Sequence, residues 1–438
     1  MSELPAHRVV IVGGGFGGLS AARALRRAPV KVALIDRRNF HLFQPLLYQV
    51  ATGGLSPANI AAPLRSIVER QENCEVLLGE VRGFDVGDRL VRFDGTQLAY
   101  DTLIVAAGSR DSYFGHPEWE KFAPGLKSIE DATQIRRRLL TAFELAEREE
   151  NVDRRRRLLT FIIVGGGPTG VELAGTMAEI SRHTLKHEFR HIDPSDAQII
   201  LIEAGERILA AYPPDLSAKA QQSLERLGVV VRTKTMVANV AVDRVLVKFG
   251  GAEEVLLTDT VVWAAGVEAS PLAKLLATAT GAPVDRAGRI VVEADLSLPG
   301  HPEVFAIGDM ASYAQDGKPL PGVAPVAIQQ GRFVAKLINA QLRGRTPPTF
   351  HYRNLGNMAT IGRSAAVAEF GKLHVGGFVA WVMWLFVHLM NLVGFRNRLL
   401  VLMQWGWNYV TYDRSARLIT GPDEGEVPPD EQPPQSDS

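Results

Sequence analysis

The sequence predicts an α/β fold made of two similar strand–turn–helix units, the second inserted into the first, followed by an apolar helical region. Three observations predict it. A glycine-rich turn follows a short apolar strand at Gly13–Gly18 and again at Gly165–Gly170. Each unit later has a strand that ends in Ala-Ala-Gly, at Ala106–Gly108 and at Ala264–Gly266. The chain then becomes rich in Trp, Leu, Val, Met and Phe over residues 376–412.

The first glycine turn lies in a segment that reads as strand, turn, helix and strand over residues 8–36. In a Rossmann-like domain such a turn lets the backbone approach a pyrophosphate, and the helix N-terminus stabilises the phosphate charge. An acid at the end of the next strand, here Asp36, accepts hydrogen bonds from ribose hydroxyls. We therefore expect a dinucleotide at this turn, bound by Gly13, Gly15, Phe16, Gly17, Gly18 and Asp36.

The second glycine turn follows the apolar strand Phe161–Val164, and the next strand of its unit ends at Glu203. A carboxylate at that position favours NADH, because it would repel a 2′-phosphate. Arg207 leaves some use of NADPH open, and a plain surface acid remains the alternative for Glu203. The residues expected at this site are Gly165, Gly167, Pro168, Thr169, Gly170, Glu203, Ala265 and Gly266.

Glu172 lies two residues after the second glycine turn, which places it in the expected first turn of a helix. A helix dipole stabilises a carboxylate there. We predict that Glu172 faces the nicotinamide, near the point where the hydride leaves. An ordinary acid at a helix start is the alternative.

A further buried strand, Val304–Asp309, ends in Gly-Asp and has no glycine turn of its own. It is therefore predicted to return to the first unit, which makes the second unit an insertion. The predicted limits are 1–125 with 285–345 for the first dinucleotide-binding domain, 126–284 for the second, 346–420 for a membrane-anchoring region and 421–438 for a disordered tail rich in Pro, Asp, Glu and Ser.

Composition excludes several classes of protein. The formal net charge is zero, so nothing in the charge favours nucleic acid as a partner. Cys74 is the only cysteine, so a redox-active dithiol of the kind that disulfide reductases use is excluded. The segment Met1–His7 has no apolar core of a signal peptide, and we expect the protein to stay in the compartment where it is made. No metal site is expected.

The apolar C-terminal region contains two runs, Gly376–Gly394 without a formally charged residue and Leu399–Val410, and we expect the basic segment Phe395–Arg398 between them to be a turn. Four of the six tryptophans lie in these runs, as is typical of a membrane interface. The second run is too short to span a bilayer. We expect two helices that lie on the membrane surface, with a dimer interface or a true span as alternatives.

These residues together resemble the type II NADH dehydrogenases, the NADH:quinone oxidoreductases that do not pump protons. The resemblance covers roughly residues 8–412. It rests on both glycine turns, the Asn39–Gly53 segment, the Trp263–Val267 segment, the Ala306–Asp309 strand end, the Ala327–Gly331 segment and the Trp-rich region.

The resemblance implies non-covalent FAD in the first domain, NADH in the second and a quinone that enters from the membrane side. Besides the first glycine turn, the implied FAD residues are Asp36, Arg37, Gln44, Pro45, Thr52, Ala107, Gly108, Gly308, Asp309, Ala327 and Gln329. The implied catalytic residues are Glu172, Gln329 and Gln330. Many members have a glutamine at the quinone site where this chain has Pro325, whose side chain cannot donate a hydrogen bond, so Gln329 or Gln330 would have to serve.

The expected function is transfer of a hydride from NADH to FAD and of two electrons to a membrane quinone, without proton pumping, in a respiratory chain. The expected location is the cytoplasmic face of the plasma membrane, bound through residues 376–412, with a homodimer left open. Two alternatives remain: a reductase of a ferredoxin- or rubredoxin-type protein, and a membrane-attached NADH-binding sensor without quinone turnover.

Overall fold

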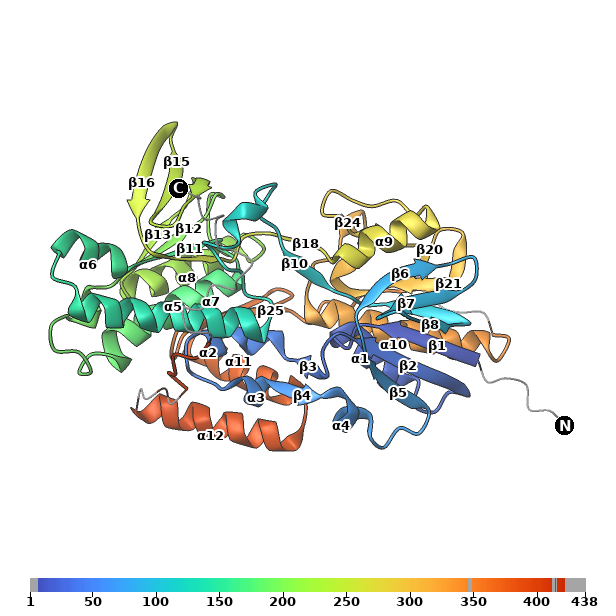
Figure 1. Cartoon of the computed structure of the whole chain (residues 1–438). Helices are drawn as coiled ribbons and strands as arrows, with labels where there is room; N and C mark the ends of the chain where they lie inside the picture. Colours follow the sequence, from blue (N-terminus) through green and yellow to red (C-terminus); the bar gives the residue numbers. More distant parts are fainter. Residues whose placement is uncertain (1–6, 346–348, 412–413, 415, 422–438) are drawn as a thin grey trace, which may run out of the picture.

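Two parallel sheets form the centres of two lobes, and the C-terminal helices lie beneath the lobe that contains the second sheet (Figure 1). The computed structural model describes residues 7–345, 349–411, 414 and 416–421. The predicted disordered tail lies outside the described residues from 422 onward. The α/β fold class with two Rossmann-like units is confirmed.

The first sheet has the strand order β20-β21-β9-β1-β2-β5 and is parallel except at β20. Its strands are β1 (His7–Val12), β2 (Val30–Asp36), β5 (Cys74–Leu78), β9 (Thr102–Val105), β20 (Ser297–Leu298) and β21 (His301–Ala306). The four inner strands β21, β9, β1 and β2 each contain a continuous run of buried apolar residues, as expected of a parallel sheet that is covered on both faces. The predicted return of the 304–309 strand is seen in β21, which pairs with β9.

The second sheet has the order β13-β12-β11-β17 and is entirely parallel. Its strands are β11 (Thr160–Val164), β12 (Gln198–Ile202), β13 (Val229–Arg232) and β17 (Thr260–Trp263). The register repeats that of the first sheet. Val12 pairs with Ile35 and Val105, and Val164 pairs with Ile202 and Trp263. Both glycine turns therefore begin at the same edge of equivalent sheets.

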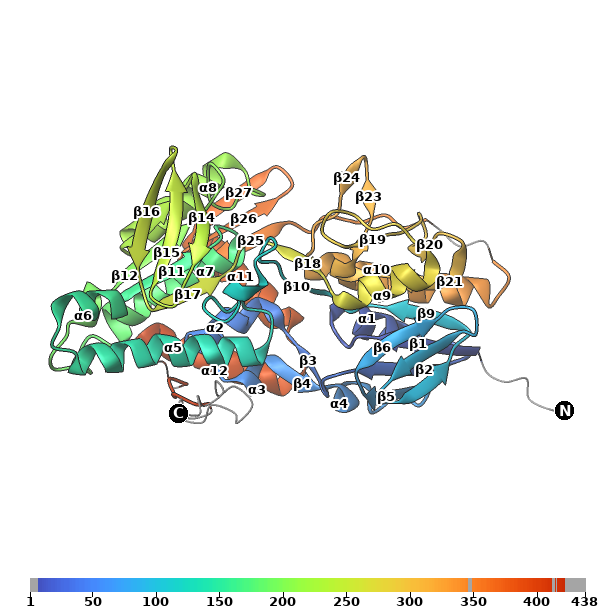
Figure 2. The same cartoon turned by 45° about the horizontal axis from the view of Figure 1, so that its top comes forward.

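Each unit also carries a three-stranded antiparallel meander. The first has β6 (Val81–Asp85), β7 (Leu90–Phe93) and β8 (Thr96–Ala99), and the second has β14 (Thr235–Val240), β15 (Arg244–Phe249) and β16 (Ala252–Leu257). Figure 2 shows the second meander on the far side of its lobe from α12 (Phe395–Thr411). The repeat therefore includes the parallel sheet and the meander as well as the glycine turn.

The chain leaves the first unit through β10 (Ser109–Asp111) and returns through β18 (Val267–Ala269), and these two strands pair with each other between the lobes (Figure 1). After β18, helix α9 (Pro271–Thr280) packs against β6, and its buried Ala273 and Leu276 belong to the core of the first unit. Residues 271–280 thus lie with the first lobe although the expected limits place them in the second. The exact domain limits stay a prediction.

The larger helices cover the sheets and join the lobes. Helices α1 (Phe16–Ala24) and α10 (Ala324–Gln341) pack together on the first sheet, while α5 (Ile129–Arg148), α7 (Pro168–Glu179) and α8 (Pro214–Arg226) belong to the second lobe. The segment 39–53 folds as β3 (Phe40–Leu42), a short 3-10 turn Gln44–Leu46 and α2 (Leu47–Ala51). Smaller helices are α3 (Pro57–Ile60), α4 (Leu64–Val68) and α6 (Val152–Leu158), and smaller strands are β4 (Ala61–Pro63), β19 (Ile290–Val291), β22 (Ala311–Ser312), β23 (Ala314–Gln315) and β24 (Lys318–Pro319).

The C-terminal region begins with a three-stranded sheet, β25 (Asn357–Thr360), β26 (Ala366–Phe370) and β27 (Leu373–Gly377), and continues with α11 (Phe378–Asn391) and α12. The segment Phe395–Arg398, expected to be a turn, forms the first turn of α12. Among the described residues, none of the helices combines the length and the apolar character needed to cross a bilayer.

Candidate active site

The first glycine turn has the close approaches that a dinucleotide site needs. Gly13 has φ +103°, and a Cβ there would lie 2.4 Å from the Ala106 carbonyl oxygen at the end of β9. A Cβ on Gly18 would lie 1.9 Å from the Gly13 carbonyl oxygen, so the turn and α1 are in contact. Gly15 has nothing within 4 Å of its Cβ position, and no side chain caps α1. The start of α1 is thus open to an anion.

The second turn has the same geometry. Gly165 has φ +110°, and its Cβ would lie 2.5 Å from the Ala264 carbonyl oxygen. A Cβ on Gly170 would lie 1.9 Å from the Gly165 carbonyl oxygen, and Gly167 is open. Pro168 and Thr169 are the first two residues of α7. The two turns therefore match at their first, third and last glycines.

The two predicted ribose acids are held in the same way. The Asp36 carboxylate accepts hydrogen bonds from the backbone N–H of Gly14 at 2.6 Å and of Arg38 at 2.7 Å. The Glu203 carboxylate accepts from Gly166 at 2.7 Å and Gly205 at 2.6 Å. A carboxylate has about four acceptor positions. Each acid is thus fixed beside its glycine turn with acceptor capacity left for hydroxyl groups.

Arg207, which left NADPH use open, points its guanidinium at the backbone. It donates to the carbonyl oxygens of Tyr212 and Ala210, both at 2.7 Å. Those two bonds hold it in the loop after β12. The structure therefore gives Arg207 a role in the shape of that loop.

The residues expected around FAD gather where α10 meets the first turn. A Cβ on Gly17 would lie 3.4 Å from the Ala327 carbonyl oxygen, and one on Gly308 would lie 3.4 Å from the Ala327 Cβ. The Asp309 carboxylate accepts from the Ser109 hydroxyl at 2.9 Å. Ala107 donates its N–H to the sulfur of Met310, and Gly108 has φ +69° with open space around it.

The two glutamines assigned to catalysis are both engaged with backbone groups. The buried Gln330 accepts from the Gly308 N–H at 2.7 Å. Gln329 accepts from the Arg353 N–H and donates to the Arg353 carbonyl, both at 3.0 Å. Gln330 thus shapes the Gly308 turn, and Gln329 ties α10 to the segment before β25. Their catalytic role stays a prediction.

The segment 39–53 lies against the first turn. The His41 ring contacts the Gly14 carbonyl oxygen at 2.9 Å and packs edge-on to Phe16. Gln44 donates to the Lys127 carbonyl at 3.1 Å, Pro45 follows in the same short turn, and Arg37 is exposed beside Asp36. Thr52 donates to the Tyr48 carbonyl at the end of α2. This segment joins the two lobes along the side where the C-terminal helices lie.

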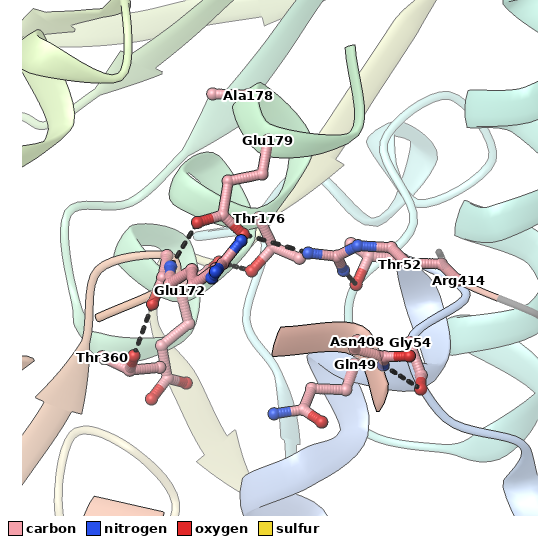
Figure 3. A network of polar contacts seen from close by, with 12 residues as sticks. Gln49, Thr52, Gly54, Glu172, Thr176, Ala178, Glu179, Thr360, Asn408 and Arg414 are labelled. Atoms are coloured by element: carbon pink, nitrogen blue, oxygen red, sulfur yellow. Dashed lines mark hydrogen bonds and ion pairs between the residues drawn. The ribbon is translucent and has the colours of Figure 1, made fainter. Parts of the chain in front are cut away.

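Glu172 is the fifth residue of α7, so the placement in the first helical turn is wrong. The helix begins at Pro168, since the glycine turn ends earlier than the spacing suggests. Glu172 is buried, and burial raises the pKa of its carboxyl group to about 8, which a backbone hydrogen bond from Thr360 offsets only in part. Its environment therefore favours the neutral acid, the reverse of what a helix start would do. Figure 3 shows the side chain beside Thr360.

A buried ion pair next to Glu172 was not predicted from the sequence. Arg414 lies 3.0 Å from the Glu179 carboxylate and donates to the Thr52 hydroxyl at 3.3 Å (Figure 3). Glu179 also accepts from the backbone N–H of Arg363. The network joins α7, the end of α2, the β25–β26 loop and the segment after α12. Since Glu179 and Arg414 are far apart in the chain, no spacing rule points to this pair.

A cavity of about 100 Å³ lies beside this network, between α2, α7 and the two C-terminal helices. Its walls are aromatic and polar. They are formed by Tyr48, Gln49, Gly54, Thr176, Glu179, Thr360, Gly362, Arg363, Trp381, Trp384, Leu385, Trp405, Asn408, Tyr409 and Arg414. The tryptophans on which the membrane-interface prediction rests therefore differ in burial. Trp384 is buried in this wall, whereas Trp407 is exposed.

The outer sides of α11 and α12 form an exposed apolar face. The exposed side chains are Phe378, Val379, Val382, Phe386, Val387, Met390, Leu399, Leu400, Leu402, Met403, Trp407 and Val410. Such a concentration on two neighbouring helices marks an interaction surface. The two helices lie on the same side of the molecule as α2 and α3 (Figures 1 and 2).

Comparison with known proteins gives consistent matches over most of the chain. Residues 7–331 match the pyridine nucleotide-disulphide oxidoreductase family model, and residues 354–411 match the NDH2 C-terminal domain. The chain is 47% identical to the type II NADH:quinone oxidoreductase NdhA of Mycobacterium tuberculosis, over 94% of this chain and 89% of that protein. It is 46% identical to Ndh of the same organism, over 94% and 90%.

Solved structures show the same fold at low identity. NDH2 from Plasmodium falciparum in complex with NADH superposes with a TM-score of 0.86 at 20% identity, covering 94% of this chain and 99% of that one. The sulfide:quinone oxidoreductase of Aquifex aeolicus superposes with a TM-score of 0.72 at 16% identity, covering 94% and 92%. Both support the two-lobe architecture.

Proposed function

The chain belongs to the type II NADH:quinone oxidoreductases, and from this premise we propose how its residues divide the work. The enzyme transfers a hydride from NADH to FAD and passes two electrons on to a quinone. When bound, the cofactors supply the redox chemistry, so the protein has to bind, orient and shield them. The observation that carries the proposal is the second glycine turn, in which Gly165, Gly167 and Gly170 repeat the geometry of Gly13, Gly15 and Gly18.

We assign FAD to the first lobe. Its residues fit the group for two reasons. The start of α1 has no side-chain cap and Gly15 has open space around it, and the Asp36 carboxylate keeps free acceptor positions. The Gly308 turn, held by Gln330, lies next to that helix start. Residues 39–53 then form the wall toward the second lobe.

NADH fits the second lobe for the same reasons. Glu203 is fixed at the end of β12 with acceptor capacity for ribose hydroxyls, and its charge opposes a 2′-phosphate. The second turn opens onto the start of α7, where the dinucleotide phosphates would lie.

Glu172 is proposed to hold the proton that quinone reduction requires. The overall reaction consumes NADH, one proton and quinone, and it yields NAD⁺ and quinol. A carboxyl group with a pKa of about 8 is mostly protonated at neutral pH. It is able to deliver that proton from its Oε atoms and to recover it from solvent between turnovers.

The membrane is proposed as the surface that the exposed face of α11 and α12 contacts. Apolar side chains on two short helices, with Arg396 and Arg398 at the start of α12, suit a helix pair lying in the bilayer interface. We place the enzyme at the cytoplasmic face of the plasma membrane, in a respiratory chain and without proton pumping, as the family resemblance implies. A homodimer through the same face is the competing proposal.

The test is a two-step anaerobic titration of the purified protein. NADH should bleach the yellow flavin spectrum, and a short-chain quinone added next should restore it. A spectrum that NADH leaves unchanged contradicts the assignment of both dinucleotides. Bleaching that quinone does not reverse, but a ferredoxin or rubredoxin does, supports the reductase alternative instead.

A further inference from the structure

Phe114 combines an exposed apolar ring with a strained backbone. It lies in the loop that follows β10, has φ +51° and is 67% exposed. A left-handed conformation is rare for a bulky residue. Among the described residues, Leu209 and Leu296 are the other large apolar residues with positive φ, and both are buried. Their packing offsets the strain, whereas the described residues leave most of Phe114 uncovered.

The backbone around Phe114 is anchored to the second lobe. Ser112 donates its N–H to the Gly266 carbonyl at 3.3 Å, and its own carbonyl accepts a hydrogen bond from Trp263 Nε1 at 2.9 Å. Trp263 is buried, and the centre of its ring lies 6.4 Å from that of Phe114. The loop that carries the exposed ring is therefore held in place before any ligand binds.

The Phe114 ring lies at the sheet edge where the second glycine turn begins. A Cβ on Gly266, just after the end of β17, would overlap the tip of this ring. The two residues before Gly266 contact the turn, because a Cβ on Gly165 would lie 2.5 Å from the Ala264 carbonyl oxygen and 2.7 Å from the Ala265 nitrogen. The ring therefore borders the site assigned to NADH.

The order of the strands indicates which half of the dinucleotide passes this ring. In the order β13-β12-β11-β17 the connections reverse at β11, and a dinucleotide binds across such a point. Glu203, at the end of β12, is placed for the ribose on the adenine side, which carries the 2′-phosphate in NADPH. The nicotinamide half is therefore expected on the other side of the turn, toward β17. From there the chain returns through β18 to the first lobe, where FAD is assigned.

We propose that Phe114 binds the nicotinamide half of NADH by packing its ring against it. This inference rests on the proposed function. An aromatic ring packs well on a flat heterocycle, and the contact would cover the surface that Phe114 exposes. A nicotinamide held in this way is oriented for hydride transfer before the reaction begins. The strained conformation of Phe114 is then part of a preformed ligand site.

The test is equilibrium binding to the purified flavoprotein by calorimetry, with two probes. NAD⁺ carries the nicotinamide nucleoside, and ADP lacks it. Phe114→Asn removes the ring, and asparagine adopts a left-handed backbone more readily than phenylalanine does. The Kd for NAD⁺ should rise about tenfold, an effect typical of losing one aromatic stacking contact, while the Kd for ADP stays within about twofold of wild type. The melting temperature should be equal or higher.

Two further variants serve as controls. Phe114→Tyr keeps the aromatic ring and should bind NAD⁺ like wild type. Val242→Ala controls for the loss of an exposed apolar side chain, because Val242 is 70% exposed in the same lobe, in the turn between β14 and β15. It should change neither Kd.

An unchanged Kd for NAD⁺ in Phe114→Asn would overturn the inference and leave the proposed function intact. An equal rise in Kd for NAD⁺ and ADP, or a lower melting temperature, would also overturn it, because the ring would then serve the shape of the whole site or the fold. The proposed function itself fails if NADH does not bleach the flavin of the wild-type protein.

Discussion

The Glu172 carboxyl group makes the stability of this protein depend on pH. Its pKa in the folded state is about 8, raised from 4.5 by burial, so between these values the folded state binds the proton more tightly than the unfolded chain. Stability from this group is therefore full below about pH 4.5 and is lost as pH rises through 8. Glu172→Gln should remove that loss and raise the melting temperature at pH 8.5 by on the order of 5 °C.

The measurement is a thermal melt of wild type and variant at several pH values from 5.5 to about 8.5. Glu72→Gln, which changes an exposed acid in the first lobe, is the control and should melt like wild type throughout. Parallel curves for wild type and Glu172→Gln would show that the carboxyl group titrates normally.

Glu203 sets the choice between the two nicotinamide dinucleotides in the proposed site. Glu203→Gln keeps an acceptor oxygen for Gly166 or Gly205 but removes the charge that opposes a 2′-phosphate. The ratio of kcat/KM for NADH to that for NADPH should fall about tenfold. Because Arg207 is held by backbone carbonyls, it should not rescue NADPH binding in the wild type. An unchanged ratio would mean that Glu203 serves only to fix its turn.

At the scale of single residues, the sequence predicts acids that follow a strand, but it does not predict ion pairs between residues that are distant in the chain. Asp36 and Glu203 were identifiable because a parallel strand delivers its last residue to the edge where the glycine turn lies. The contact between Glu179 and Arg414 depends on the C-terminal segment folding back over α7, which no local pattern encodes. The same holds for the cavity, whose walls come from four separate helices, the end of β25 with the loop after it, and the segment after α12.

Helices α1 and α10 must approach closely if the first turn is to keep its shape. A Cβ on Gly331 would lie 2.2 Å from the Gly17 carbonyl oxygen, so Gly331→Ala should push α10 away and disturb the Gly308 turn that Gln330 holds. Overpacking of this kind costs about 1–3 kcal/mol. The variant should melt at a lower temperature and lose flavin during gel filtration, seen as a lower ratio of flavin to protein absorbance.

Gly406→Ala, in the middle of α12, is the matched helical control, since nothing lies within 4 Å of its Cβ position. It should retain its flavin and be slightly more stable. Equal flavin content in the two variants would show that the helices tolerate the wider spacing. The segment containing Gly331 was recognised in the sequence as part of a motif, but the reason for the glycine needs the partner helix.

The boundaries of α12 illustrate what periodicity misses at the scale of an element. The charged residues of 395–398 suggested a turn between two apolar runs, yet they open the helix, because Gly394 at φ +89° already makes the turn. The chain folds back there by a single left-handed residue. Arg396 is thus exposed at the start of α12, between the two helices of the apolar face.

The whole molecule consists of two lobes of similar architecture and a C-terminal region. The strand registers, the glycine turns and the meanders repeat between the lobes. The spacing of the glycines and of the acids that follow them predicts this repeat from the sequence. The C-terminal sheet and helices have no counterpart in the repeat. They close the cavity on one side and present the apolar face on the other.

The apolar face should control membrane binding independently of NADH oxidation. Phe386 and Met403 are each 65% exposed, one on α11 and one on α12, so replacing both by serine should leave the fold intact. Removing two such side chains from the bilayer interface costs about 3–5 kcal/mol of binding, which lowers the affinity for vesicles at least a hundredfold. Co-sedimentation with vesicles containing anionic lipid should fall accordingly, while ferricyanide reduction by NADH stays at the wild-type level.

Phe249→Ser is the control, because Phe249 is 53% exposed on β15, on the opposite side of its lobe from α12 (Figure 1). It should bind vesicles like wild type. Vesicle binding that survives the double substitution would contradict the membrane assignment. If the double variant instead changes from dimer to monomer in sedimentation velocity without detergent or lipid, the face joins two copies of this chain, and the competing proposal holds.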